Sequence, residues 1–350
     1  MRRTKFTAAL AVSILALAGC GSSGSDDGDS GSGNGGGGGE GDIKVGLAYD
    51  VGGRGDQSFN DSAAAGLDRA ADEFSISSDE SEAEDGEAEA AREERLRTFA
   101  ENDYDVVIAV GFAYATAIGA VAPDYPEVEF AVIDDSTNEF DNVTNLVFAE
   151  EQGSFLVGAA AALTSESNHV GFVGGVQTPL IEKFEAGYTA GAQAVNPDVQ
   201  VDVTYLTQPP DFTGFADPAR GKTAAQGMFD AGADVVYHAA GGSGGGVFEA
   251  AQEAGGRAIG VDSDQYNTAD EAVRDVILTS MLKNVDVAVY EFLSDIDAGE
   301  DPSGTVTYDL EADGVGYSTS GDFLTPEVIE QLEGFKEQII AGEIEVPTAP

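Results

Sequence analysis

Cysteine, histidine and basic residues are scarce in this sequence, and each scarcity argues against a kind of protein. Cys20 is the only cysteine, so no intrachain disulfide can form. His169 and His238, the two histidines, stand far apart in apolar sequence, which predicts ordinary strand residues and not a zinc site. The 16 lysines and arginines face 64 acidic residues, for a net charge of −48. Nucleic acid is therefore not an expected partner, because binding it needs a positive surface.

The excess of acid predicts a solvated, strongly negative surface. The alternative, a specific cation-binding surface, has no acidic cluster with ligand spacing to support it. We therefore expect a protein adapted to high salt, with no bound metal or cofactor.

The 350 residues, 42% of them hydrophobic, are enough for two domains of ordinary size.

The N-terminal apolar run, residues 7–18, is too short to span a membrane and has the length of a signal peptide's hydrophobic region. Arg2 and Arg3 precede it, as in an abbreviated twin-arginine export signal. "LAGC" at its end resembles a lipobox, which predicts a lipoprotein signal peptide over residues 1–20 and a lipid on Cys20. The lipid would anchor the protein to the outer face of the cytoplasmic membrane. A plain secretory signal with a chance cysteine is the alternative.

Residues 21–41 contain no apolar side chain apart from glycine, so they predict a flexible tether. From Ile43 onward, strand-like segments alternate with helix-like segments. The strand-like runs are short and almost continuously apolar, as in parallel strands buried on both faces. The alternation predicts doubly wound α/β sheets. In residues 80–89, which are mostly acidic, we expect an exposed loop or the start of a helix.

The alternation forms two series of similar size, which predicts two lobes with a cleft between them. The expected boundaries are 42–149 plus about 285–303 for the first lobe, 150–284 plus about 304–320 for the second, and 321–350 for a final helix and tail. We expect the hinge near residues 149–151, 284–285 and 303–305.

Ligands bind such sheets at the carboxyl ends of the strands. The expected strands end at Asp50, Asp134, Gly241 and Asp262. The polar segments "GDQSFN", "GFADPARGK" and "SMLKNVD" lie beside these ends. The glycine-rich run from Gly241 lacks the Lys-Ser/Thr of a phosphate-binding loop. We expect it to let the backbone approach a ligand closely.

Taken together, these segments resemble the basic membrane protein family of lipoproteins, which includes purine nucleoside receptor-type substrate-binding proteins of ABC transporters. The matching stretches are "AYDVGGRGDQSFNDSAAAGL", "FAVIDD", "EEQGSFLVGAAAAL", "VGFVGG", "AGYTAGAQAVNP", "GADVVYHAAGGSGGGVFEAA", "IGVDSDQ" and "TSMLKNVDVAVY". They cover nearly all of residues 43–320 in the family's order. The resemblance implies a two-lobed type I periplasmic-binding-protein fold, in which each lobe is a doubly wound, mostly parallel sheet flanked by helices.

The resemblance also implies roles for single residues. The Phe59 ring would stack on a base, and the Asn60 amide would form hydrogen bonds with the edge of that base. Without the resemblance, the two residues would also suit a hydrophobic staple and an N-cap for the helix that follows. Asp50 would bond to the base, although an aspartate before two glycines also suits a turn. Asp134 would bond to base or ribose. Asp135, the next residue, should face the other way.

Two segments depart from the family pattern. Residues 74–92 are unusually acidic, and the insert "QPPDFTG" leaves Phe212 and Phe215 as candidates for a second stacking ring. The family motif F-x-D-P favours Phe215. Asp262 and Lys283 are expected to form a pair that accepts from and donates to the sugar of a nucleoside. A structural ion pair at the lobe boundary is the alternative.

Few catalytic signals stand out in the sequence. It contains no HExxH pair and no evident nucleophilic triad. We therefore expect a binding protein and not an enzyme: a lipid-anchored, extracytoplasmic protein that captures a nucleoside, with a purine favoured, and delivers it to an ABC permease. The alternatives are a binder of another small polar ligand such as a sugar, a surface regulator, and a hydrolase on the same fold.

Overall fold

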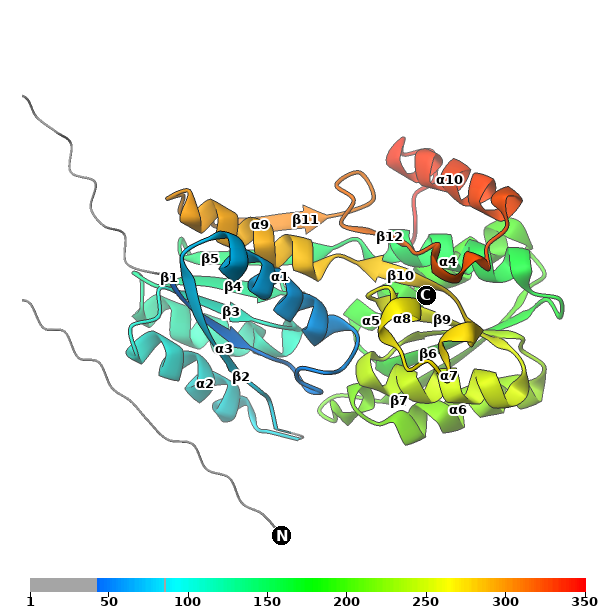
Figure 1. The fold of residues 1–350 in the computed structure, drawn as a ribbon, viewed down its shortest axis with the longest axis horizontal. Coiled ribbons are helices and arrows are strands. Elements are labelled where there is room, and N and C mark those ends of the chain that lie inside the picture. The colour runs from blue at the N-terminus through cyan, green and yellow to red at the C-terminus, as the bar shows by residue number, and fades with distance from the viewer. Residues whose placement is uncertain (1–42, 85) are drawn as a thin grey trace, which may run out of the picture. The chain divides into compact units, whose positions relative to one another are not determined.

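The structure, a computed structural model, describes residues 43–84 and 86–350, so the expected signal peptide, Cys20 and the whole tether lie outside the described residues. Two six-stranded sheets form the two lobes of this part of the chain (Figure 1). The first sheet has the order β11-β5-β4-β3-β1-β2, and all its neighbours pair in parallel. The second has the order β12-β10-β9-β8-β6-β7, in which only β12 pairs antiparallel. This arrangement confirms the predicted two-lobed α/β fold.

The strands of the first sheet are β1 (Ile43–Ala48), β2 (Ile76–Ser81), β3 (Val106–Ala109), β4 (Glu129–Ile133), β5 (Val143–Phe148) and β11 (Gly304–Tyr308). Those of the second are β6 (His169–Val176), β7 (Gln200–Thr207), β8 (Val235–Ala239), β9 (Arg257–Asp262), β10 (Ile277–Lys283) and β12 (Val315–Tyr317). Both histidines lie in strands, His169 in β6 and His238 in β8, as the sequence predicted.

Helices cover both faces of each sheet. Those of the first lobe are α1 (Phe59–Glu73), α2 (Glu89–Glu101), α3 (Ala115–Val121) and α9 (Val285–Asp297). Those of the second are α4 (Glu150–Thr164), α5 (Pro179–Val195), α6 (Pro218–Ala231), α7 (Gly244–Ala254), the short α8 (Gln265–Thr268) and α10 (Pro326–Ile340). Side chains of α2 and α3 pack together with one face of the first sheet, while α1 and α9 contribute to the core on its other face.

Local sequence fixes where several helices begin and end. Thr178, Asp217 and Thr325 each accept a hydrogen bond from a backbone N–H of the first turn that follows, and each precedes a proline that starts the helix. Gly232 and Gly255 end α6 and α7 in left-handed backbone, a conformation that glycine adopts without steric cost. These caps account for the agreement between the expected and observed helices of the second lobe.

The chain passes between the two sheets three times. It crosses after β5, after β10 and after β11, so the third crossing spans residues 309–314. The expected third hinge at 303–305, and the expected place of 304–308 in the second lobe, were therefore wrong. The reason is that β11 pairs with β5 along its whole length, from Gly304 opposite Thr144 to Tyr308 opposite Phe148. Strand β5 itself is not among the strands that the sequence predicted.

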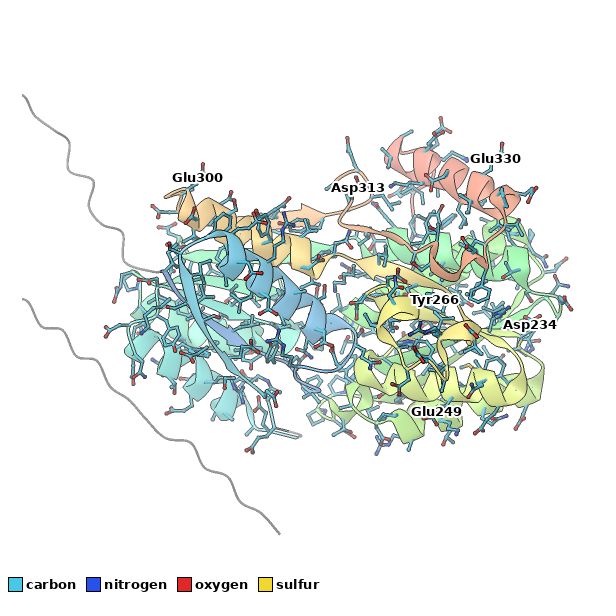
Figure 2. The ribbon with its side chains drawn as sticks, viewed as in Figure 1. Asp234, Glu249, Tyr266, Glu300, Asp313 and Glu330 are labelled. Carbon is cyan, nitrogen blue, oxygen red and sulfur yellow. The ribbon has the colours of Figure 1, made fainter. Side chains whose placement is uncertain are left out.

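Carboxylates project from the surface of both lobes; Glu300, Asp313 and Glu330 are among those that point outward in Figure 2.

The acidic segment 80–89 contains both exposed and buried side chains. Glu82, Glu84 and Glu89 are exposed, but β2 extends to Ser81 and the Glu87 side chain is only 3% exposed. Glu87 is buried because Arg95 donates to it at 2.6 Å and Arg92 lies 3.6 Å away. The segment leads into the start of α2 at Glu89, as expected, while Glu87 is a buried exception within the loop.

Candidate functional site

One pocket lies where the carboxyl ends of strands from both sheets meet. The space within it, counted out to its opening toward solvent, is about 520 Å³. Its lining from the first lobe is Val51, Asp56, Phe59, Asn60, Phe112 and Asp134. Its lining from the second lobe is Leu180, Ile181, Phe184, Phe215, Ala239, Ala240, Gly241, Val261, Asp262 and Lys283.

Most of the residues singled out from the sequence meet at this pocket. Those that line it are Phe59, Asn60, Asp134, Phe215, Gly241, Asp262 and Lys283. Asp50 is not part of the lining. Residues that lie far apart in the chain thus meet at one pocket, as expected for residues at or near the carboxyl ends of strands.

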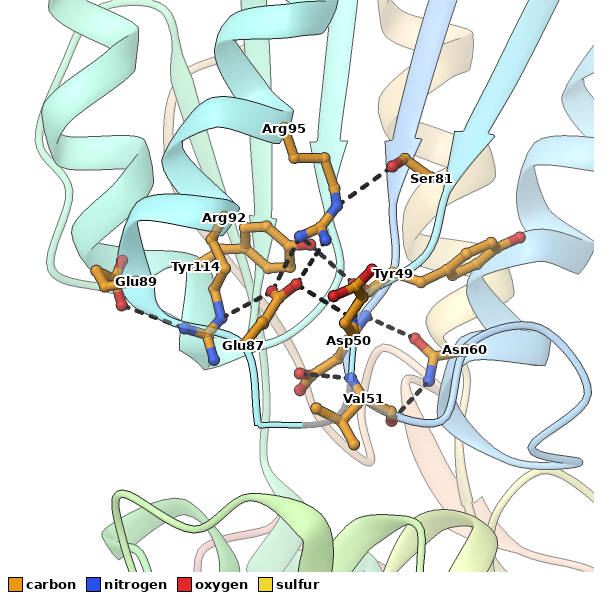
Figure 3. Close-up of polar contacts among 11 residues, drawn as sticks. Tyr49, Asp50, Val51, Asn60, Ser81, Glu87, Glu89, Arg92, Arg95 and Tyr114 are labelled. Carbon is orange, nitrogen blue, oxygen red and sulfur yellow. Dashed lines mark hydrogen bonds and ion pairs between the residues drawn. The ribbon is translucent and has the colours of Figure 1, made fainter.

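Asp50 is buried just after the end of β1, and Figure 3 shows the polar contacts around it. Its carboxylate accepts from the N–H of Val51 at 2.8 Å, which is the turn-forming contact that the sequence allowed. Burial raises its pKa to about 6, although the backbone bond and Arg92 act in the opposite direction. A network of Glu87, Arg92, Arg95 and Tyr114 lies beside it in Figure 3.

The Asn60 amide is held by the protein. Its Oδ1 accepts from the N–H of Asp50 at 3.0 Å, and its Nδ2 donates to Asp56 Oδ2 at 3.0 Å and to the Val51 carbonyl at 3.5 Å. An amide has two donor hydrogens and two acceptor lone pairs. The second lone pair of Oδ1 is therefore what this side chain can offer to a ligand.

Lys283 binds carboxylates other than the one that the sequence suggested. Its ammonium is 2.6 and 2.7 Å from the two oxygens of Asp134, and 3.1 Å from Glu150 Oε1. Lys283 and Asp262 both line the pocket, but no ion pair joins these two described residues, because Asp134 and Glu150 occupy the positions nearest the ammonium. Burial opposes the charged form of Lys283, yet the carboxylates Asp134, Glu150 and Asp262 together raise its pKa above the ordinary value. Burial raises the pKa of Asp134 to about 6, against the influence of Lys283.

Asp262 instead contacts the opposite lobe. Its Oδ2 accepts from the Ser58 hydroxyl at 2.5 Å, and Gln265 Nε2 donates to the Gln57 carbonyl at 3.0 Å. Burial raises the pKa of Asp262 to about 7, while the Lys283 charge and the Ser58 bond act to lower it. These contacts join the end of β9 to the loop before α1, so the two lobes touch beside the pocket.

The backbone is strained at the corresponding strand ends of both lobes. Asp134 has φ 70° and Asp262 has φ 64°, both in the left-handed region. Non-glycine residues are uncommon there, although aspartate tolerates it better than most residues. Such outliers cluster at binding sites. The two carboxylates are therefore candidates for ligand contacts on geometric grounds that the sequence alone does not reveal.

Four phenylalanines belong to the apolar part of the lining: Phe59, Phe112, Phe184 and Phe215. Of the two candidates for a second stacking ring, Phe215 lines the pocket. Phe212 lies outside the lining. The centre of its ring is 5.8 Å from the centre of the Phe112 ring and 5.6 Å from the guanidinium carbon of Arg92. Phe212 thus contacts the first lobe from the second.

Sequence reasoning missed part of the lining, namely Val51, Asp56, Phe112 and the α5 residues Leu180, Ile181 and Phe184. The α5 residues carry a usable signal. Leu180 and Ile181 directly follow the capping pair Thr178–Pro179 after β6, and Phe184 lies one helical turn further on. A helix that starts at the end of a strand presents its first residues to the site. Asp56 lies within the segment "GDQSFN" that the sequence had placed near the strand ends, whereas Phe112 has no comparable signal.

The lining suits a compact ligand with an aromatic part and several hydrogen-bonding groups. Rings and aliphatic side chains cover an apolar body, while the carboxylates accept from hydroxyl or amine donors.

Within residues 43–84 and 86–350, no group of three or more metal-ligating side chains could hold an ion. In the same residues, no helix has the length and apolar character needed to cross a membrane.

Comparison with known proteins agrees with this fold and site. A family model described as "ABC transporter substrate-binding protein PnrA-like" matches residues 43–349. The CD4+ T-cell-stimulating antigen of Listeria monocytogenes is 38% identical over 88% of this chain and 89% of its own length. An ABC transporter nucleoside-binding protein, BmpA, of Lactococcus lactis subsp. cremoris is 34% identical over 88% and 90%.

A solved structure shows the same fold. The ABC transporter system solute-binding protein from Aeropyrum pernix K1 matches with a TM-score of 0.77 and 31% identity, covering 87% of this chain and 93% of that one. Proteins of this class bind a ligand outside the cytoplasm and work with a permease; they are not enzymes. The chain therefore belongs to the PnrA-like family of ABC transporter substrate-binding proteins, as its sequence motifs predicted.

Proposed function

We propose that this protein captures a nucleoside, a purine nucleoside above all, between its two lobes and delivers it to an ABC importer. The observation that carries the proposal is the composition of the pocket. Phe59 on one lobe and Phe215 on the other give apolar ring surface for a base, and Asp134 and Asp262 give acceptors for hydroxyl groups. The nucleoside-binding relative at 34% identity supports the same ligand class.

Each lining residue has a proposed role. Phe59 and Phe215 stack on the base, and Asn60 accepts from its edge through Oδ1. Asp50 serves the base indirectly, since its N–H fixes the Asn60 oxygen at 3.0 Å. Gly241, with φ 52°, offers a main-chain group at close approach. Asp134, Asp262 and Lys283 serve the sugar.

The charge of the lining favours a nucleoside over a nucleotide. Three aspartates, Asp56, Asp134 and Asp262, face the pocket with Lys283 as the only cation in its lining. The ammonium is already engaged by Asp134 and Glu150. A phosphate would meet carboxylates without a free counter-charge, which costs binding energy. We expect adenosine to bind at least about tenfold more tightly than AMP.

The N-terminal features complete the proposal. "LAGC" supports a lipid on Cys20 that holds the protein on the outer face of the cell membrane, and residues 21–41 serve as the tether. The membrane permease of an ABC transporter is the proposed partner. A lipid-anchored receptor stays near its permease while the tether lets the lobes capture ligand.

The proposal is tested by calorimetric titration of the purified protein with adenosine, guanosine, uridine, AMP, adenine and ribose. Saturable one-to-one binding of a nucleoside that exceeds the binding of its free base and of ribose supports it. Tight binding of ribose or another sugar, with no heat from any nucleoside, would instead assign the pocket to a sugar.

A further inference from the structure

Glu150, the first residue of α4, is a charged side chain with 0% exposure. It stands directly after β5, where the chain crosses from the first lobe to the second. The positive end of the helix dipole favours a carboxylate there. A fully buried charge still needs close partners, because its desolvation is costly.

Two lysines supply those partners. Glu150 Oε2 accepts from Lys183 of α5 at 3.0 Å, and Oε1 lies 3.1 Å from the ammonium of Lys283. Lys283 in turn holds both oxygens of Asp134. Charges of alternating sign thus run from Lys183 through Glu150 and Lys283 to Asp134, and their formal sum is zero. Lys183 also donates to the Phe148 carbonyl at 3.4 Å, which ties α5 to the end of β5.

The ammonium of Lys283 has little freedom within this arrangement. The ring centres of Phe59, Phe148 and Phe184 lie 5.1, 5.0 and 5.7 Å from its nitrogen. An ammonium has three N–H donors. The two Asp134 oxygens accept hydrogen bonds from it and Glu150 Oε1 forms an ion pair with it at 3.1 Å, so a ligand hydroxyl competes with these carboxylates for the ammonium.

We propose that Glu150 is a positioning residue for ligand binding: its carboxylate holds the Lys283 ammonium against the pocket wall while Lys183 anchors the carboxylate. Glu150 keeps Lys283 in place when a ligand hydroxyl displaces one bond to Asp134. The inference rests on the proposed nucleoside site for its ligand. A purely structural ion-pair chain is the competing explanation.

The test is a double-mutant cycle between Glu150→Gln and Lys283→Met, with Glu151→Gln as the matched control. Glutamine keeps the shape of Glu150 and removes its charge. Glu151 is the next residue of the same helix, and within residues 43–84 and 86–350 its carboxylate forms no ion pair. Dissociation constants for adenosine and adenine are measured by calorimetry, and unfolding by urea.

Glu150→Gln should weaken adenosine at least about tenfold, as expected for the loss of a charge-assisted contact. Adenine should change by less than about threefold, since it lacks the sugar. In the Lys283→Met background, Glu150→Gln should cause no further loss of adenosine affinity, and Glu151→Gln should bind like the wild type. If Glu150→Gln does not fold, Lys183→Met replaces it in the cycle with the same expected direction.

Additive losses in the cycle, or equal losses for adenosine and adenine, would overturn the inference and make the chain of charges structural. The proposed function would survive either result. Failure of the wild-type protein to bind any nucleoside would overturn both the proposed function and this inference.

Discussion

Replacing Asp262 by asparagine should make the protein more stable at alkaline pH and a poorer binder. The carboxylate is 8% exposed and has one close hydrogen-bond donor, Ser58. Burial raises its pKa from 3.8 to about 7. At about 1.36 kcal/mol for each tenfold change in proton affinity, this corresponds to a cost of roughly 4 kcal/mol to the folded protein above pH 7. An amide keeps part of the desolvation cost, so we expect a gain of about 1–3 kcal/mol at pH 8.

The sign of the pH dependence follows from the raised pKa. Below pH 3.8 the carboxyl is protonated in the folded and the unfolded chain alike, and it costs nothing. As the pH rises toward about 7, the unfolded chain releases its proton while the folded protein retains it. The cost of this group to the folded protein therefore grows between pH 3.8 and about 7 and is complete above about 7. The advantage of Asp262→Asn should accordingly shrink from pH 8 to pH 5.

Urea unfolding of the wild type and Asp262→Asn at pH 5 and pH 8 measures this effect, with the exposed Asp270→Asn as control. Asparagine can still accept from Ser58, so the contact between the lobes survives. Adenosine affinity should fall at least about tenfold, since an amide offers a hydroxyl donor only a neutral acceptor. A variant that is less stable than the wild type at pH 8, or a difference that does not vary with pH, would refute the reasoning.

Three further changes test other parts of the account. Phe59→Ala should weaken nucleoside binding by roughly 1–3 kcal/mol, the range for base–aromatic stacking; lost stability with unchanged affinity would instead assign the ring to the start of α1. Cys20→Ser should release the protein from membranes in a fractionation assay, and retention after a carbonate wash would count against lipidation. The melting temperature should rise between low and molar salt, because screening weakens repulsion among 64 acidic residues; a flat or falling curve would remove this argument.

Much of the fold was predictable because many strands are short, continuous apolar runs that are easy to recognise in the sequence. Strand β3, "VVIA", is buried at every position, and such runs alternate with helices that have clear caps. Strand β5, "VTNLVF", was missed because Thr144 and Asn145 interrupt its apolar pattern. Both are buried, and each has a partner far along the chain: Thr144 donates to the Pro302 carbonyl, and Asn145 to that of Gly304 at 3.4 Å. Only the folded chain reveals those partners.

In the pocket, the positions of the residues could be predicted from the sequence, but the pairing of their charges could not. Strand ends predicted where Asp134, Gly241, Asp262 and Lys283 would meet, because topology alone brings strand ends together. Topology does not decide which charges pair. Lys283 and Asp262 end neighbouring strands of one sheet, yet the ammonium points to Asp134 of the other lobe. The choice depends on side-chain direction and on Glu150, whose position beside Lys283 no sequence pattern indicates.

Calorimetric titration of the purified wild-type protein with adenosine and guanosine, alongside adenine and ribose, tests the central claim most directly. The account predicts one ligand per chain, a nucleoside dissociation constant at or below about 1 µM, and binding at least about tenfold weaker for the free base and for ribose. Ribose or another free sugar bound as tightly as any nucleoside, or no nucleoside bound at all, would contradict it.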